Sequence, residues 1–506
     1  MPIRLFHIPN VRIYTKYLPP SCHFHALAQS SATEYFNNSV ASLTKPPPPN
    51  KPHFYSHPST NMETEILPVD PKKLGKITFR EAQNEELVDE WSIDYQESRD
   101  LESLSRAARE LVETDTPVGF PTETVYGLAA DATRSSAVRA IFAAKGRPAD
   151  NPLIVHVHSI SQLQSLLREG TEVAKEEKDL IPEIYKPLIR KFWPGPLTII
   201  LPNPVNSVLA PEVTAGLNTF GARMPRSILT LALIRLAGVP LAGPSANAST
   251  RPSPTAAEHV KDDLDGRIHT IIDGGPCEVG VESTVVDGLW NPPIILRPGG
   301  VTVEQLRQCP GWENVIIGYK DAHENGIKPR APGMKYRHYS PKAAVILHES
   351  GASIPTQDNL LAHGKSVGFI RTKSWPKALG LPVRSAAFGL ANRNGISQSS
   401  QVITPNGNEQ PVNSNPSNLL RSIIQHQIPH AEHLVLENES SAPLDIWDIH
   451  LGRNTEDVAR GLFSALRELD KKNVDVIYVE GIDDKVGDDI AAAVMNRLRK
   501  AAEIHV

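Results

Sequence analysis

The sequence predicts an α/β protein made of two globular parts. Short apolar runs typical of buried strands alternate with segments of helical periodicity between residues 104 and 296, and a second series of the same kind begins at residue 343. Between them, residues 321–342 contain Pro329, Pro332 and Gly333, which is typical of a linker. A chain of 506 residues has room for two or three domains of about 150 residues each.

The first domain is expected at residues 62–320 and holds most of the pattern. Apolar side chains recur there at helical spacing, and short apolar runs between turn residues indicate strands. Helices are expected at residues 104–112, from a cap at Ser135 or Ser136 to near Gly146, around 163–167, at 228–236, and from near Thr255. Strands are expected at residues 116–120, 153–157, 197–201, 239–242, 268–272, 284–286 and 294–296.

The second domain is expected at residues 343–506. Its predicted strands are residues 343–347, 367–370, 434–436 and 474–479, and its predicted helices lie near 455–470 and 488–502. Residues 392–418 are rich in Asn, Ser, Gln and Pro, which predicts a disordered surface loop within this domain.

Composition excludes several classes of protein. The formal net charge is −5, so any contact with RNA or another anion must come from a local patch. The three cysteines lie far apart, which fits a reducing compartment and excludes a disulfide framework or a zinc ribbon. No apolar run approaches the ~18 residues of a membrane span. The Walker pattern, a dinucleotide-binding glycine motif and HExxH are absent. We therefore expect a cytoplasmic protein with no membrane partner.

Residues 1–61 differ from the rest of the chain. Five basic residues stand there against one acid, Glu34, and a run of four prolines begins at Pro46. This leader is either a mitochondrial transit peptide or a disordered extension. Because Met62 could start a cytosolic form, the chain is expected in the cytoplasm and, through the leader, also in mitochondria. Imaging residues 1–61 fused to a fluorescent protein tests this, and a diffuse signal contradicts it.

Polar side chains crowd the chain directly after the strand predicted at 116–120. Thr122, Glu123, Thr124 and Tyr126 stand within five positions. A buried polar group without a partner costs about 1–3 kcal/mol. Such a cluster therefore suits the mouth of a pocket that positions a small polar ligand. The alternative is a tight turn whose threonine hydroxyls bind the nearby backbone.

Further polar loops follow other predicted elements. Lys145 and Arg147 end a helix, where they either bind phosphate or satisfy the last helix carbonyls in solvent. Ser245 and Asn247 follow a strand, where such groups favour anions or cap the next helix. A glycine-lined loop from Gly274 to Thr284 enters a further strand, and Arg297 ends the next one. Four polar loops therefore lie at strand ends, where α/β sheets bind ligands.

These residues resemble, in the same order, the motifs of the YrdC-type threonylcarbamoyl-AMP synthases. The resemblance covers residues 100–305, and later segments are similar to the linker and tail of the long, two-domain form. Phe220 and Ser249-Thr250 depart from the family pattern, which puts local backbone geometry in doubt but not the activity. The matching motifs are Pro121–Leu128, Lys145–Pro148, Asn151–Leu153, Trp193–Thr198, Arg223–Pro225, Ser245–Asn247, Glu282–Asp287, Arg297–Gly299, Pro332–Pro341 and Met495–Ala501.

The resemblance implies a fold and a reaction. The fold is a twisted, mixed, open sheet with helices (YrdC-like), followed by a smaller Rossmann-like α/β domain. The enzyme would be a nucleotidyltransferase that makes threonylcarbamoyl-AMP and pyrophosphate from L-threonine, bicarbonate and ATP, with Mg²⁺ expected on the phosphates through unknown protein ligands. A partner transferase would then modify tRNA adenosine beside the anticodon.

The resemblance also implies roles for individual residues. The linker, residues 321–342, would form a lid that excludes water, and the second domain would mainly place that lid. The implied catalytic residues are Lys145, Arg147, Ser245 and Asn247; the implied threonine-binding residues are Thr124, His156, Arg223, Gly243 and Ser283; the implied ATP-binding residues are Arg147, Asn151, Thr219, Ser245, Ser253, Arg297 and Tyr336; and Lys335 and Tyr339 belong to the lid.

Two alternatives stay open at this point. One is a non-enzymatic module of the same fold that binds double-stranded RNA, although the chain has no aromatic platform for base stacking. The other is a carbamoyltransferase domain like that of hydrogenase maturation, although the cysteine spacing of its zinc finger is absent.

Overall fold

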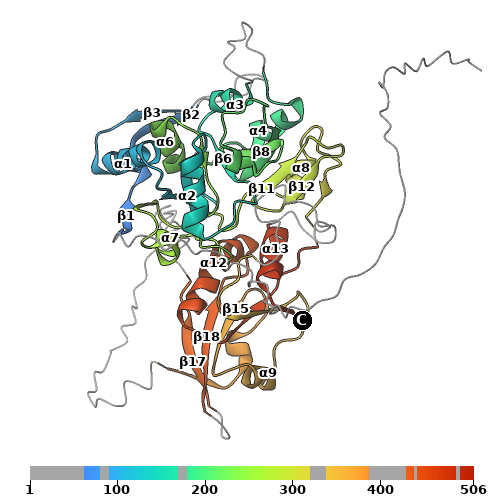
Figure 1. The fold of residues 1–506 in the computed structure, drawn as a ribbon. Helices are drawn as coiled ribbons and strands as arrows, with labels where there is room; N and C mark the ends of the chain where they lie inside the picture. Colours follow the sequence, from blue (N-terminus) through green and yellow to red (C-terminus); the bar gives the residue numbers. More distant parts are fainter. Residues whose placement is uncertain are drawn as a thin grey trace, which may run out of the picture. The chain divides into compact units, whose positions relative to one another are not determined.

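The computed structural model describes residues 62–79, 91–168, 179–319, 338–386, 429–437, 442–485 and 490–506. The predicted leader, most of the linker and the polar segment at 392–418 lie outside these ranges. Residues 60–506 form one compact unit, which contains two large sheets (Figure 1).

The first large sheet of the described chain has eleven strands and is mixed. β6 and β8 run parallel, whereas β8 and β7 run antiparallel. β1 and β13 form its two edges, so the sheet is open, as predicted. In spatial order its strands are β1 (Glu65–Pro68), β10 (Thr270–Asp273), β4 (Val118–Phe120), β5 (Gly127–Asp131), β9 (Leu241–Ala242), β6 (Ile154–His156), β8 (Thr219–Arg223), β7 (Leu197–Pro202), β11 (Thr284–Asp287), β12 (Ile294–Arg297) and β13 (Ile316–Ile317). A separate hairpin pairs β2 (Gly75–Phe79) with β3 (Trp91–Tyr95).

Helices pack on this sheet through their apolar faces. α6 is buried almost all round, as its composition predicts, and α1 begins at the cap Ser98. The predicted cap of α2 was wrong, because Arg134 is the N-cap and the Ser135 hydroxyl donates to Glu212 instead. The helices here are α1 (Arg99–Glu113), α2 (Ser135–Lys145), α3 (Ile160–Leu167), α4 (Lys186–Phe192), α5 (Pro211–Thr214), α6 (Ile228–Ala237), α7 (Ala257–Leu264) and α8 (Val303–Arg307), with the 3₁₀ helices η1 (Pro71–Lys73) and η2 (Glu183–Tyr185).

The second large sheet has seven described strands. Its last five strands in spatial order run parallel to one another, which agrees with the expected Rossmann-like domain. The spatial order is β16 (Val383–Ser385), β17 (Glu432–Leu436), β18 (Leu444–His450), β15 (Ser366–Arg371), β19 (Val476–Glu480), β14 (Ala344–His348) and β20 (Ile504–His505). The described helices here are α9 (Gln357–Ala362), α12 (Thr455–Lys471), α13 (Ala491–Ala501) and the 3₁₀ helix η3 (Lys377–Gly380).

The two sheets are joined by a shared apolar core. Val125 and Val281 come from the first sheet's loops, yet they belong to the same buried cluster as Tyr339 and the α12 residue Phe463. The rings of Tyr339 and Phe463 lie 5.2 Å apart, in contact distance. Helix α12 therefore packs directly against the loops of the first domain.

Thr250 occupies a backbone conformation that favours glycine. Its φ is 72°, in the left-handed region, and it stands in the pair that departs from the family's Ser-Gly. This conformation costs an L-residue about 1–2 kcal/mol, while the greater freedom of glycine in the unfolded chain offsets about 0.5–1 kcal/mol. We expect Thr250→Gly to raise the melting temperature slightly, and Thr250→Ala to give a smaller gain. A lower melting temperature for the glycine variant would contradict this strain.

Candidate active site

Loops that follow β4 and β9, and the loop that precedes β11, converge on one cavity, together with the described end of the linker. It holds about 540 Å³ of empty space, part of it open to solvent. Loops drawn from distant parts of the chain thus meet at one place. The predicted site residues among its lining are Thr124, Arg147, His156, Arg223, Gly243, Ser245, Ser283, Arg297 and Tyr339.

Arg223, at the end of β8, is held from several sides. Its Nη1 donates to Thr124 Oγ1 at 2.9 Å, and its Nε donates to the Gly195 carbonyl at 3.2 Å. Its Nη2 lies 2.7 Å from Glu123 Oε1 in a buried ion pair. Arg223 Nη2 and Glu123 Oε1 have no geometrically aligned hydrogen bond with any described residue. Arg223 therefore keeps a fixed orientation and a donor for a ligand carboxylate.

His156, at the end of β6, is a neutral imidazole beside this arginine. Burial, and then the charge of Arg223, lower the pKa of His156 to about 3. Its Nδ1 is buried and has no hydrogen-bond partner among the described residues. A Cβ on Gly243 would lie 2.8 Å from that nitrogen and 3.1 Å from the Phe120 ring, so only glycine fits there. The imidazole can therefore serve as a neutral polar contact for a ligand.

The Lys-x-Arg and Ser-x-Asn pairs meet at the same cavity. Lys145 Nζ donates to the carbonyls of Ser245 and Asn247, both at 2.5 Å. The Ser245 hydroxyl donates to Asn247 Oδ1 at 2.5 Å. Burial and the nearby Arg147 charge lower the pKa of Lys145 well below its usual range. Lys145 and Asn247 therefore stabilise the Ser-Ala-Asn turn through hydrogen bonds without lining the cavity, whereas Arg147 and Ser245 line it.

A carboxylate that the sequence assigned to no role, Glu282, also lines the cavity. Its Oε1 accepts from the Ser253 hydroxyl at 2.6 Å, and its Oε2 accepts from Arg497 Nε at 2.9 Å. Arg497 lies in α13 of the second domain and is fully buried. Nearby, Arg297 donates to the carbonyl and the hydroxyl of Ser283, both at 3.1 Å. The second domain therefore supplies the cation that pairs with a carboxylate of the cavity lining.

The pKa of Glu282 makes it a source of pH-dependent stability. Burial alone would raise this pKa, but the charges of Arg497 and Arg297 lower it to about 2. An unfolded glutamate titrates near 4.5. As the pH falls, the unfolded chain therefore binds this proton before the folded protein does. The stabilisation is fully present above about pH 5 and is lost as the pH falls from 4.5 to about 2.

We expect this carboxylate to contribute roughly 3 kcal/mol of pH-dependent stability across that window. Urea unfolding of the wild type between pH 2 and pH 6 should show the loss. Glu282→Gln has no carboxylate to protonate, so its free energy of unfolding should change less over the same range. If the free energy of unfolding changed equally with pH in the two proteins, this role of Glu282 would be contradicted.

Several predicted residues do not line the cavity. Asn151 is buried, and its Oδ1 has no hydrogen-bond partner among the described residues. Thr219 begins β8, and Arg223 ends it, so their backbones lie about 13 Å apart at ordinary strand rise. Their assignment to ATP, and that of Ser253, stays a prediction. Lys335 and Tyr336 lie outside the described residues.

The end of the linker borders the cavity. His338 and Tyr339 are among its lining residues, and Tyr339 is buried. Burial and the Glu282 charge raise the pKa of Tyr339 above its usual range, so its hydroxyl stays protonated. The Ser340 N–H donates to the Thr250 carbonyl at 2.9 Å. The linker is thus anchored to the loop that follows the Ser-Ala-Asn turn, and its action as a lid stays a prediction.

The described residues include no group of three or more His, Cys, Asp or Glu side chains that could hold a metal ion. In the same part of the chain, no helix is both long enough and apolar enough to cross a membrane.

Comparison with known proteins identifies the family. A Sua5/YciO/YrdC family model, described as telomere recombination, matches residues 110–299, and a model described as the C-terminal domain of threonylcarbamoyl-AMP synthase matches residues 301–503. The chain is 40% identical to the threonylcarbamoyl-AMP synthase of Schizosaccharomyces pombe over 469 residues, which is 88% of this chain and 98% of that protein. It is 38% identical to that of Bacillus subtilis over 79% of this chain and 92% of the other.

A solved structure agrees with these matches. The crystal structure of Pyrococcus abyssi Sua5 complexed with L-threonine is similar at a TM-score of 0.59 and 34% identity, covering 88% of this chain and all of that one. Both domains are therefore matched in sequence and in fold. The chain belongs to the threonylcarbamoyl-AMP synthase family, in its two-domain form.

Proposed function

We propose that this protein is an L-threonylcarbamoyladenylate synthase, a nucleotidyltransferase that consumes L-threonine, bicarbonate and ATP. The threonine amine attacks the carbon of bicarbonate, and water leaves. A carbamate oxygen then attacks the α-phosphorus of ATP, and the bond to the leaving pyrophosphate breaks. The products are threonylcarbamoyl-AMP, pyrophosphate and water.

The observation that carries this proposal is one cavity lined by cationic side chains from separate parts of the first domain. Arg223 and Thr124 are hydrogen-bonded to each other in the cavity lining and suit an amino acid carboxylate. Arg147 and Ser245 line the same cavity and suit a phosphate whose charge grows during attack. Holding two reactants side by side in this way removes much of the entropic barrier of a bimolecular step.

His156 and the linker residue Tyr339 complete this cavity. His156 stays neutral at physiological pH, so it adds no charge that would compete with Arg223 for the threonine carboxylate. Tyr339 is buried against the second domain and lines the cavity, which supports exclusion of water from an intermediate that water would hydrolyse.

Mg²⁺ is proposed to enter with ATP. The described residues offer no cluster of carboxylates for a resident ion. Mg²⁺ commonly binds through substrate phosphates and water with few protein ligands. The ion would supply charge neutralisation on the phosphates, while Arg147 provides the fixed positive charge of the protein.

Threonine-dependent release of pyrophosphate from ATP tests the proposal. Purified protein incubated with labelled bicarbonate should also yield a labelled adenylate. An RNA-binding module would release no pyrophosphate, and a carbamoyltransferase of the hydrogenase-maturation type would not require threonine. Either result would overturn the proposed function. We further propose that the product is passed to a tRNA threonylcarbamoyl transferase, and that the leader directs some copies to mitochondria.

A further inference from the structure

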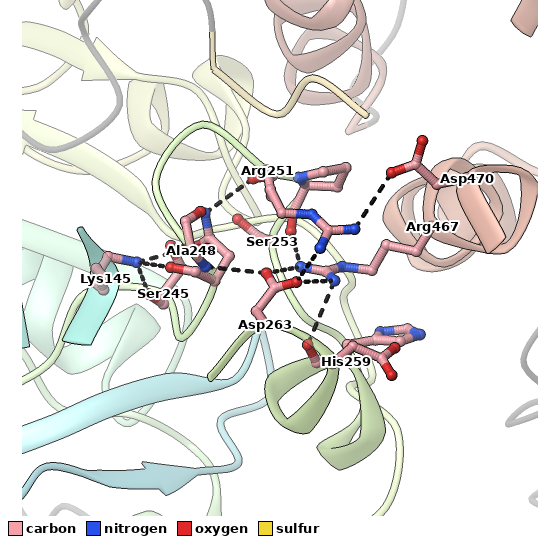
Figure 2. Close-up of polar contacts among 12 residues, drawn as sticks. Lys145, Ser245, Ala248, Arg251, Ser253, His259, Asp263, Arg467 and Asp470 are labelled. Atoms are coloured by element: carbon pink, nitrogen blue, oxygen red, sulfur yellow. Dashed lines mark hydrogen bonds and ion pairs between the residues drawn. The ribbon is translucent and has the colours of Figure 1, made fainter. Parts of the chain in front are cut away.

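A cluster of four charges, three of them buried, joins the second domain to the loop that carries Ser245. Arg467 and Asp470 project from α12, while Arg251 and Asp263 belong to the first domain (Figure 2). The side chains of Arg467, Asp263 and Asp470 are at most 3% exposed. Two cations face two anions, so the cluster is neutral as a whole. No residue of this cluster lines the cavity.

The guanidinium of Arg467 forms a bidentate ion pair with the carboxylate of Asp263. Nη1 donates to Oδ1 at 3.1 Å, and Nη2 donates to Oδ2 at 2.7 Å. The same guanidinium also donates to the carbonyls of Pro252 and His259. This two-point geometry fixes the direction of the carboxylate as well as its charge.

Asp263 in turn holds the loop beside the Ser-Ala-Asn turn. Its Oδ2 accepts the backbone N–H of Ala248 at 3.0 Å, and Ala248 directly follows Asn247. The amide of Asn247 donates to the carbonyls of Ala248 and Arg251. Lys145 approaches the same turn from the side opposite Asp263 (Figure 2). The turn therefore lies between Lys145 and Asp263, and Arg467 of the second domain orients the Asp263 carboxylate.

The same cluster receives the end of the linker. Asp470 Oδ1 accepts the backbone N–H groups of Lys342 and Ala343, at 2.7 and 3.2 Å. Its Oδ2 lies 3.3 Å from Arg251, which also pairs with Asp263 at 2.9 Å. An unbroken chain of contacts therefore links the end of the linker to the Ser-Ala-Asn turn.

We propose that Arg467 is a positioning residue: acting through Asp263, it sets the Ser245–Asn247 turn for reaction with the phosphate. The second domain would thereby contribute to catalysis as well as to placing the linker. This inference rests on the proposed function, since its effect is read from the same reaction. It assigns Arg467 no contact with substrate.

The test uses the full chain and threonine-dependent pyrophosphate release. Arg467→Gln should lower kcat about tenfold or more, because small displacements of a positioned group carry large rate penalties. The KM for threonine should stay within about twofold, since Arg223 and Thr124 hold that substrate from other elements. Lys471→Gln is the matched control, because Lys471 joins the same two helices through an exposed pair with Asp262. Its kcat should change by less than about twofold.

A double-variant cycle separates positioning from general structural damage. If Arg467 acts through the turn, adding Arg467→Gln to Ser245→Ala should slow the enzyme by no more than about twofold beyond Ser245→Ala alone. If the fold-losses of kcat caused by Arg467→Gln and by Ser245→Ala multiplied in the double variant, the proposal would be overturned. An unchanged kcat in Arg467→Gln would also overturn it.

A second variant covers the case in which Arg467→Gln does not fold. Arg467→Lys keeps a cation opposite Asp263 but loses the two-point contact, so it should remain folded and still lower kcat about fivefold. Wild-type kcat in a folded Arg467→Lys protein would overturn the proposal. A wild-type protein that releases no pyrophosphate would instead refute the proposed function itself.

Discussion

Arg147→Ala is expected to abolish threonine-dependent pyrophosphate release while leaving the fold intact. The left-handed Gly146, with a φ of 62°, ends α2 and turns the chain so that Arg147 follows it at the cavity. Burial lowers the pKa of Arg147, opposed by the nearby Asp150. Arginine nevertheless stays protonated in proteins. Removing a preorganised charge of this kind costs about 10²–10³-fold in kcat.

Arg139→Ala is the matched control for this experiment. Arg139 is a cation of α2, the helix that precedes Arg147, its side chain is 60% exposed, and it pairs with Glu212 away from the cavity. Both variants should melt within a few degrees of the wild type, because neither arginine belongs to the apolar core. Pyrophosphate release should persist only in the Arg139 variant. Undiminished turnover in Arg147→Ala would refute the assigned role.

The sequence predicted most strands of the first sheet but missed two in its interior. β5 and β8 contain glycine and alanine and end in a charged residue, a composition that propensity assigns to turns. The packing of neighbouring strands requires these small residues. A Cβ on Gly127 would lie 2.5 Å from the Phe120 ring, and one on Gly221 would lie 3.3 Å from Thr198. Such contacts between strands are invisible in a local window of sequence.

The residues of the candidate site were likewise only partly predictable from the sequence. Polar residues in strand-end loops could be found locally, because they interrupt apolar runs where ligands usually bind. Taken alone, Lys145 was better explained as a solvated helix end, yet the structure buries it beside the Ser-Ala-Asn turn. Arg467 and Arg497 lie 204 and 215 residues from their partners Asp263 and Glu282. On amphipathic helices they resemble ordinary surface charges, so only tertiary packing reveals their role.

These buried arginines change the result expected from removing the second domain. If that domain mainly placed the lid, a protein ending at residue 342 would keep full activity. Its removal would instead uncover Val125 and Val281, which are buried with Phe463 in a shared core. It would also leave Glu282 and Asp263 without Arg497 and Arg467.

We therefore expect the protein ending at residue 342 to be unstable and inactive. Exposing Val125 and Val281 to water costs about 1.5–3 kcal/mol each, which is large against the roughly 5–15 kcal/mol that stabilises a whole domain. Glu282 and Asp263 would also lose the arginines that orient them at the site. Thermal melting and pyrophosphate release of the shortened protein are the measurements. The double variant Glu282→Gln/Arg497→Met separates the causes, because it removes both charges of one pair while keeping the second domain in place. If the shortened protein melts and turns over like the wild type, the interdomain ion pairs contribute little, and placing the lid is enough to explain the second domain.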